Sequence, residues 1–413
     1  MEIANFCLFI TSLFFARKNL IVVIYIILLF LFCYVRYIVS LIDSNYLVGA
    51  MEWVFPGVSD EAVNVYSMLY LILGAAVLVC GIFVKDNRVG VLYVTRKFYF
   101  NIFVTFSILL LSYKTLLLFS VLIENGYLAV VDFRIPTWLS IFSSSLVKPI
   151  VLSLALLYAS KKDRFYLLLF FLMLFLMALS GQRKDLVTIL IFFICCLLSP
   201  DKNRWIKLVF SLVLIYFLAM TIFYLREDGF SFSGYSLVDL FWGIGFSVNS
   251  GLFVVGNPSS FSPLDSLGFI NTYWHCGLGR LFSDLCYNSE RLNAPGFLLE
   301  KIANHLTFEN ETLFGGIGGN LLGSIYVASG LNEQLNLIAL LYFVLFCFMT
   351  TLLVILFICY IPVGVTYALI VTNLIVSSRY AFDGFIPPVN QLLVAIFIDV
   401  FFIKKYTSLG LNK

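Results

Sequence analysis

Residues 335–361 read LNLIALLYFVLFCFMTTLLVILFICYI and carry no charged side chain. An α-helix needs about 20 apolar residues to cross the roughly 30 Å hydrocarbon core of a bilayer, so this stretch predicts a transmembrane helix. Other apolar runs begin near Ile3, Asn19, Val63, Phe98, Trp138, Phe165, Leu186, Trp205, Gly364 and Val389. The sequence therefore predicts an all-α polytopic membrane protein of about 11 transmembrane helices, with residues 1–413 forming a single integral membrane domain.

The composition agrees with this class and excludes others. Of the 413 residues, 62% are hydrophobic and 12% are charged, and the mean hydropathy is +1.01. A soluble fold of this length needs far more polar surface. The net charge is only +3, and the basic residues are scattered between apolar runs instead of forming one face. We therefore expect membrane lipids around the chain and no nucleic-acid partner.

The first apolar run, residues 3–15, is short and rich in phenylalanine. No positive charge precedes it and no small-residue cleavage site follows it, which argues against a removable signal peptide. The run is either a first transmembrane helix or an amphipathic helix lying in the membrane interface.

The basic residues of the short connections predict the orientation. Five clusters, near residues 17–18, 85–97, 161–164, 202–207 and 404–405, alternate with acidic connections along the chain. Together with Lys413 the clusters hold 15 basic and 3 acidic residues, whereas the other connections hold 8 basic and 19 acidic residues. Because cytoplasmic loops are enriched in lysine and arginine, we expect the clusters in the cytoplasm and the acidic connections outside.

One outer connection, residues 226–334, is much longer than every other and lies between the predicted helices 8 and 9. Loops of this length usually carry a function. Residues 237–255 are apolar enough to lie in the interface or to re-enter the membrane, and residues 297–308 have the spacing of a short amphipathic helix. The segment is therefore predicted to act as a lid against the membrane.

Arginine outnumbers lysine on the outer side, by six to two. The guanidinium group matches two phosphate oxygens at once, which favours arginine where phosphate is bound. In residues 180–185 (SGQRKD), Arg183 and Lys184 occupy a tight outer turn against the usual charge rule. Either an anion binds in this turn, or the two flanking helices form a different hairpin and Arg183 is solvated.

Three cations fall within predicted transmembrane helices, in their outer halves: Arg36, Lys114 and Lys148. A buried cation is costly unless it pairs, reaches the interface or lines a polar cavity. Together the three predict a positively charged outer cavity, although Arg36 and Lys148 are near enough to the interface to reach it. The acidic Asp399, at the inner end, is expected to form an ion pair with Lys404 and Lys405.

The sequence offers few candidates for metal binding or acid–base chemistry. The two histidines and the cysteine spacing match no zinc motif, so we expect no metal. His305, on the polar face of the amphipathic segment, and Glu311 are candidate bases, and a merely solvated histidine is the alternative. Cys276 and Cys286 would form a disulfide if the outer chain turns back between them. The seven other cysteines lie in apolar runs and are expected to fill the core.

Three stretches carry a family resemblance: residues 180–183 (SGQR), residues 311–330 (ETLFGGIGGNLLGSIYVASG) and residues 377–383 (SSRYAFD). With the helix count and the long outer loop, the chain resembles the bacterial O-antigen polymerases (Wzy). The resemblance implies a GT-C-like membrane glycosyltransferase in the bacterial inner membrane, with its active site facing the periplasm. It also implies undecaprenyl-pyrophosphate-linked oligosaccharides as donor and acceptor in lipopolysaccharide biosynthesis, no cofactor, and a chain-length regulator as partner.

The resemblance also assigns roles to residues. Pyrophosphate is the leaving group, so cations must stabilise the charge that develops on it. Arg183 is carried over from the family-like turn, Arg226 and Arg379 are added by topology, and Arg280 is held in reserve. Glu311 or His305 would deprotonate the acceptor hydroxyl.

Three rival functions share parts of this pattern. An O-antigen ligase has the same kind of donor and outer loop. A flippase or exporter of lipid-linked oligosaccharide also needs a cationic cavity, but should have internal repeats and short loops on both sides. A membrane acyltransferase would need a histidine that faces a cytoplasmic acyl donor, whereas both histidines are predicted outside.

Overall fold

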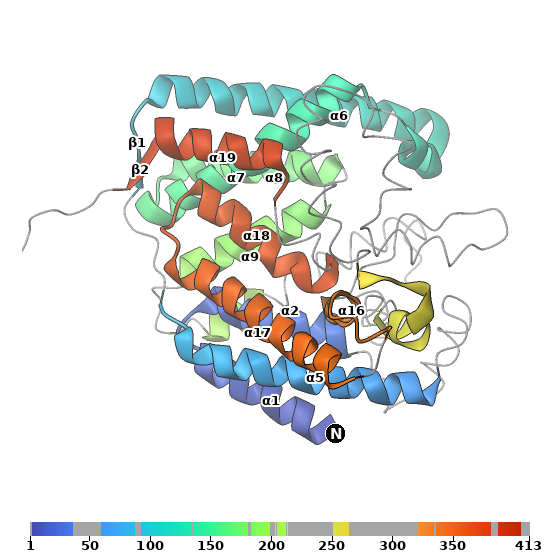
Figure 1. The fold of residues 1–413 in the computed structure, drawn as a ribbon. Coiled ribbons are helices and arrows are strands. Elements are labelled where there is room, and N and C mark those ends of the chain that lie inside the picture. Colours follow the sequence, from blue (N-terminus) through green and yellow to red (C-terminus); the bar gives the residue numbers. More distant parts are fainter. Residues whose placement is uncertain are drawn as a thin grey trace, which may run out of the picture.

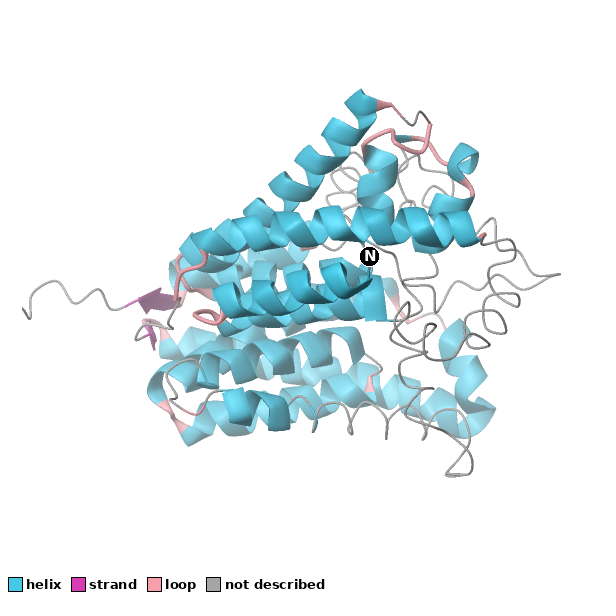
Figure 2. Cartoon of the chain, turned by 90° about the horizontal axis from the view of Figure 1, so that it is seen from below, coloured by secondary structure: helices cyan, strands magenta, loops and turns pink. Residues whose placement is uncertain are grey.

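The computed structural model describes residues 2–35, 59–86, 92–133, 135–180, 183–198, 203, 205–211, 213, 251–263, 321–333, 336–380 and 387–405. Its helices run roughly side by side in one bundle (Figures 1 and 2). The α-helices are α1 (Glu2–Ala16), α2 (Leu20–Phe30), α5 (Asp60–Cys80), α6 (Lys97–Asp132), α7 (Thr137–Lys161), α8 (Arg164–Leu179), α9 (Arg183–Leu198), α16 (Leu321–Ala328), α17 (Leu337–Tyr360), α18 (Val365–Tyr380) and α19 (Val389–Phe401).

Shorter elements complete the described structure. A π-helical turn, η1 (Leu31–Val35), extends α2. The 3₁₀ turn η2 (Gly81–Phe83) follows α5, and the 3₁₀ turn η3 (Pro258–Ser260) precedes α16. The strands β1 (Leu92–Val94) and β2 (Ile403–Lys405) form a small antiparallel pair.

The apolar runs predicted the helices well. Ten predicted starts lie within three residues of a described helix start, and residues 205–211 are helical at the eleventh. Within the described residues, four helices are long and apolar enough to cross a membrane: Glu61–Phe83, Lys97–Val121, Thr137–Lys161 and Leu337–Tyr360. Six further apolar helices are shorter. The prediction of an all-α membrane protein is confirmed at this level.

The first helix packs lengthwise against the bundle. α1 runs along α5 (Figure 1) and also contacts α2. The rings of Phe9 and Phe30 stack with their centroids 3.9 Å apart, and the Asn5 side-chain amide donates to the Ser67 carbonyl at 3.2 Å. The opposite face, which includes Ile3 and Phe14, is exposed. α1 is thus part of the bundle, with an apolar face suited to lipid.

Four of the five predicted cytoplasmic clusters lie together at one end of the bundle, where Figure 1 shows β1 and β2 at the left. Asn19, which follows the first cluster, donates its side-chain amide to the Lys85 carbonyl at 3.0 Å. The Leu92 N–H donates to the Ser160 hydroxyl at 2.7 Å, and β1 pairs with β2 so that Tyr93 faces Lys404. Contacts therefore join four of the five basic clusters, as a common membrane face requires.

Asp399 at this end has a partner that the sequence did not predict. Its two carboxylate oxygens accept the backbone N–H groups of Val365 and Thr366, each at 2.8 Å. These are among the amides at a helix start that lack a partner within the helix, and the positive end of the helix dipole favours a carboxylate there. Asp399 therefore caps α18 through the backbone, where the sequence suggested an ion pair with Lys404 and Lys405.

Two described parts of the long outer connection are packed inside the protein. All residues of α16 are buried, and this helix contacts α5, α17 and α18. Residues 251–255 are also buried. The Asn332 side-chain amide donates to the carbonyls of Pro258, at 3.1 Å, and Phe261, at 2.6 Å, so the two parts are joined. The sequence predicted an apolar or re-entrant stretch ending at Val255, but it did not predict the buried helix α16.

Candidate functional site

Arg183, which the sequence places in a tight outer turn, begins the second of two short helices. α8 and α9 each have 16 residues, or about 24 Å at 1.5 Å per residue. They contact each other and α7. Arg183 and Lys184 are the first residues of α9. The helical hairpin predicted on either side of residues 180–185 is therefore present.

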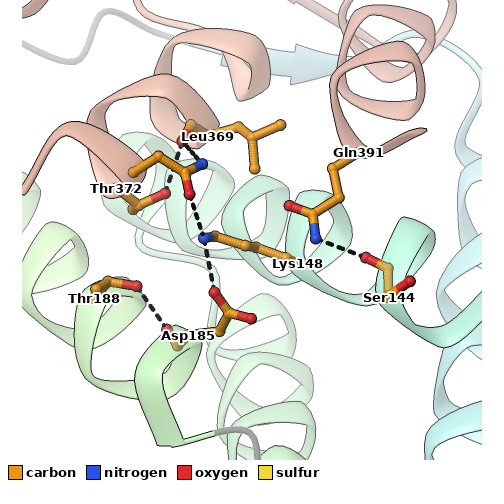
Figure 3. A network of polar contacts seen from close by, with 8 residues as sticks. Ser144, Lys148, Asp185, Thr188, Leu369, Thr372 and Gln391 are labelled. Atoms are coloured by element: carbon orange, nitrogen blue, oxygen red, sulfur yellow. Dashed lines mark hydrogen bonds and ion pairs between the residues drawn. The ribbon is translucent and has the colours of Figure 1, made fainter. Parts of the chain in front are cut away.

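An ion pair joins this turn to the bundle interior. The Lys148 Nζ of α7 lies 2.8 Å from the Asp185 Oδ1 of α9, and the side chains are 4% and 30% exposed. The same Nζ donates to the Asn373 Oδ1 of α18 at 3.4 Å. Figure 3 shows Lys148 reaching between the helices towards Asp185. Three helices thus meet at one ammonium group.

Neighbouring hydrogen bonds orient the residues around the ion pair. Asn373 donates its side-chain amide to the Leu369 carbonyl at 2.8 Å, one turn back in α18, which leaves the amide oxygen for Lys148. The Thr188 hydroxyl donates to the Asp185 carbonyl at 3.0 Å. Asp185 also interacts electrostatically with Lys114 of α6, which is partly buried. Asp185 is thus paired with Lys148 and lies in electrostatic range of a second lysine.

A proline follows Lys148 directly in α7, in a turn that α19 contacts through hydrogen bonds. Pro149 lies inside α7 and has no N–H to donate to the carbonyl four residues earlier, which disturbs the helix there. In this turn the Gln391 side-chain amide donates to the Ser144 carbonyl at 2.9 Å, and that of Asn390 donates to the Ser145 hydroxyl at 2.7 Å. The start of α19 therefore braces the turn from which Lys148 extends (Figure 3).

The position of Lys148 within α7 shows how far the start of α9 lies from the start of α7. Eleven residues separate Lys148 from Thr137 at the start of α7, which corresponds to about 16 Å along the helix. Because Lys148 contacts the first turn of α9, that helix begins beside the interior of α7 and not beside its end. Arg183 is therefore recessed relative to the start of α7.

The structure brings together only part of the predicted site. Of the predicted cavity cations, Lys148 pairs with Asp185 and Lys114 lies in electrostatic range of it, and Arg183 precedes that carboxylate by two residues. The Arg379 backbone lies in α18, six residues after Asn373. The described side chains do not include those of Arg183 and Arg379. The remaining candidates lie outside the described residues: Arg36, Arg226, Arg280, His305, Glu311, Cys276 and Cys286.

Asp185, Asn373 and Gln391 are site residues that the sequence did not single out. An acidic residue at the edge of an apolar run was a usable signal for Asp185, since Lys148 needed a partner. No comparable signal existed for Asn373, which is 225 positions from Lys148 and reaches it only through helix packing.

The cysteines in apolar runs are free, and six of the seven are buried while Cys7 is exposed. The expectation of core packing is confirmed for those six. Within the described residues, no group of three or more His, Cys, Asp or Glu side chains could hold a metal ion.

The comparison with protein families gives a match over nearly the whole chain. The model of the O-antigen polysaccharide polymerase Wzy family matches residues 3–408. The chain belongs to the Wzy family. The resemblance seen in residues 180–183, 311–330 and 377–383 is thereby confirmed, and an O-antigen polymerase role is supported. Neither the curated proteins nor the solved structures compared with this Wzy chain gave a match.

Proposed function

We propose that this protein joins lipid-linked oligosaccharide repeat units into O-antigen at the periplasmic face of the inner membrane, and that the α8–α9 turn binds the donor pyrophosphate. The observation that carries the proposal is the Lys148–Asp185 ion pair in the first turn of α9, with Arg183 and Lys184 directly before it and with Lys114 in electrostatic range of the same carboxylate. Unbalanced positive charge inside a membrane bundle favours an anionic ligand.

The start of α9 suits such a ligand for a second reason. The first N–H groups of a helix lack partners within the helix, and the helix dipole favours negative charge at this end. Phosphates are commonly bound at such helix starts. Arg183 would add a guanidinium group that matches two phosphate oxygens at once.

The reaction needs this charge where the glycosidic bond breaks. In the proposed step, a hydroxyl of the acceptor sugar attacks the anomeric carbon of the donor sugar, and the bond to the pyrophosphate oxygen breaks. The electron pair leaves with undecaprenyl pyrophosphate, whose growing charge Arg183 and Arg379 stabilise, with Arg226 and Arg280 as further candidates. The hydroxyl proton passes to Glu311 or His305. A GT-C-like architecture and a chain-length regulator belong to the same proposal.

The direction of the bundle supports the proposed side of action. Contacts join four basic clusters at one end, which the positive-inside rule assigns to the cytoplasm. α9 starts towards the opposite end, because its hairpin partner α8 begins at Arg164 in the third cluster. The pyrophosphate site would then face the periplasm.

The test is the glycan ladder on a gel from a strain that lacks this gene. The strain is complemented with wild type, Arg183→Ala or Arg164→Ala at equal membrane abundance; Arg164 starts the same hairpin at its other end and is the matched control. Lipid A core with a single repeat unit in the deletion and in Arg183→Ala, with a full ladder from Arg164→Ala, supports the proposal. Bare core with accumulated lipid-linked polymer would identify a ligase, and bare core with single units retained on the inner face a flippase.

A further inference from the structure

We infer that Asp185, Lys148 and Asn373 form a positioning network that fixes the arginines of the polymerase site, and that Lys148 itself does not bind the pyrophosphate. This inference rests on the function proposed above. It concerns which residues hold the site together, and it separates Lys148 from the cations that face the substrate.

The first step is the state of Lys148. Its side chain is 4% exposed, and its ammonium group has both a carboxylate and an amide oxygen as acceptors. Taking a charge out of water is tolerated only when a partner and further hydrogen bonds compensate. These contacts use two of the three N–H donors of Lys148, and the near-complete burial of the side chain leaves little room for a phosphate beside the Asp185 carboxylate. The present contacts of Lys148 therefore favour a structural role within the site.

The second step is what the network connects. Asp185 is in the first turn of α9, two residues after Arg183, and Asn373 is in α18, six residues before Arg379. Lys148 of α7 contacts both of these side chains. A shift of either helix would break one contact and would also move its arginine. The network therefore couples the relative position of the two arginine-bearing helices to one buried ammonium group.

The third step is the support behind Lys148. Pro149 disturbs the α7 turn that carries it, and Asn390 and Gln391 bind that turn from α19. Gln391 is 7% exposed, and its second amide atom, Oε1, has no hydrogen-bond partner in the described part of the chain. The hydrogen bond to the Ser144 carbonyl is therefore the described polar contact that orients this amide. This bracing keeps the lysine directed at α9 and α18 without adding a competing acceptor at the ammonium group.

Lys114 takes a different place in this arrangement. The Asp185 carboxylate interacts electrostatically with Lys114. Its hydrogen bond, at 2.8 Å, is with Lys148. Lys114 is only partly buried, whereas Lys148 is almost fully buried. Lys114 is therefore the more accessible of the two lysines and is the one that would face the bound pyrophosphate.

The test compares Asp185→Asn, Lys148→Met and the double variant, each purified and supplied with a lipid-linked repeat unit as donor and acceptor. Each single change leaves the partner's charge uncompensated, fully buried for Lys148 and partly buried for Asp185. Both should therefore lower the melting temperature, and the double change should recover much of it. Catalysis should not recover, because the neutral pair no longer fixes the arginines. We expect kcat to fall about 100-fold in all three, with KM within a factor of two of the wild-type value.

Asp399→Asn is the matched control, since Asp399 also binds α18 but at its other end. It should lower the melting temperature and leave kcat per folded molecule unchanged. If kcat of the double variant recovers along with its melting temperature, the network contributes only to stability and does not position the arginines. A rise in KM at constant kcat would show that Lys148 or Asp185 contacts the substrate. Either result overturns the inference, whereas full activity of Arg183→Ala would instead overturn the proposed function.

Discussion

The ammonium nitrogen of Lys148 lies 2.8 Å from a carboxylate oxygen of Asp185, and this pair joins α7 to the first turn of α9. The two residues are 37 positions apart, so the contact depends on how the helices pack. The contact holds the first turn of α9 beside the middle of α7, eleven residues from the start of that helix. The charge pair thus helps to place the candidate pyrophosphate site.

Breaking this pair from one side should be costly. Removing one partner of a buried ion pair typically costs about 3–5 kcal/mol, and because the Asp185 side chain is 30% exposed we expect Asp185→Ala to fall near the lower end. The measurement is thermal unfolding of the purified protein in detergent. Thr188→Val, which replaces the hydroxyl that donates to the Asp185 carbonyl by a methyl group of similar size, is the control and should cost about 1 kcal/mol. Equal effects of the two substitutions would contradict the ion-pair account.

The α18 start should tolerate no added methyl group. A Cβ at Gly364 would lie 2.9 Å and 3.0 Å from the two Asp399 carboxylate oxygens, well inside normal contact. Gly364→Ala must therefore displace the carboxylate or the turn and weaken the two capping hydrogen bonds, at a cost of about 1–3 kcal/mol. Gly74→Ala is the control, because its Cβ would meet the nearest heavy atom at an ordinary 3.5 Å. A melting temperature that falls only in Gly364→Ala confirms the contact, and an equal fall in both would refute it.

The helices could be predicted from the sequence because an apolar run long enough for a bilayer has few alternatives to a helix. The charge rule predicted that the basic clusters share one side, and the Lys85, Ser160 and Lys404 contacts agree for four of the five clusters. The partners of Lys148 and Asp399 could not be predicted, because they depend on helix register between distant segments. The buried α16 was missed for a related reason: at 8 residues it has no transmembrane signature.

The proline in α7 should matter more for activity than for folding. Pro149→Ala supplies an N–H for the carbonyl of Ser145 and favours a regular helix, by about 3 kcal/mol in local propensity. A straightened turn would withdraw the Ser144 carbonyl from Gln391 and redirect Lys148. We expect a shorter glycan ladder and a polymerisation rate at least about 10-fold lower, with unchanged membrane abundance. Ser153→Ala, one turn further along α7, is the control and should retain a full ladder. Wild-type polymerisation by Pro149→Ala would show that Pro149 is not needed to position Lys148.

The join between the two described parts of the outer segment depends on Asn332. Its amide makes two hydrogen bonds to carbonyls of the 258–261 turn, at 3.1 Å and 2.6 Å. Asn332→Asp removes both donors and places a carboxylate beside two carbonyl oxygens, which should cost about 2 kcal/mol or more. Limited proteolysis of spheroplasts should then cut the segment between residues 258 and 332 faster than in wild type. Asn336→Asp is the control, because its side-chain oxygen accepts the Ala339 N–H at the start of α17 and the change keeps that acceptor. Cleavage at the wild-type rate in Asn332→Asp would mean that other contacts hold the segment.

The proposed orientation can be tested with single cysteines introduced at Lys18, Lys161 and Arg134. The first two belong to clusters that the positive-inside rule assigns to the cytoplasm, whereas Arg134 is in a predicted outer connection. A membrane-impermeant maleimide applied to intact spheroplasts should label Arg134→Cys, and should label Lys18→Cys and Lys161→Cys only after the membrane is opened. The wild-type protein is the control, since exposed Cys7 sets the background. The reverse pattern would place the start of α9 on the cytoplasmic side. Arg183 could not then bind a periplasmic donor, and the proposed site would be lost even if the ion pair at Lys148 were intact.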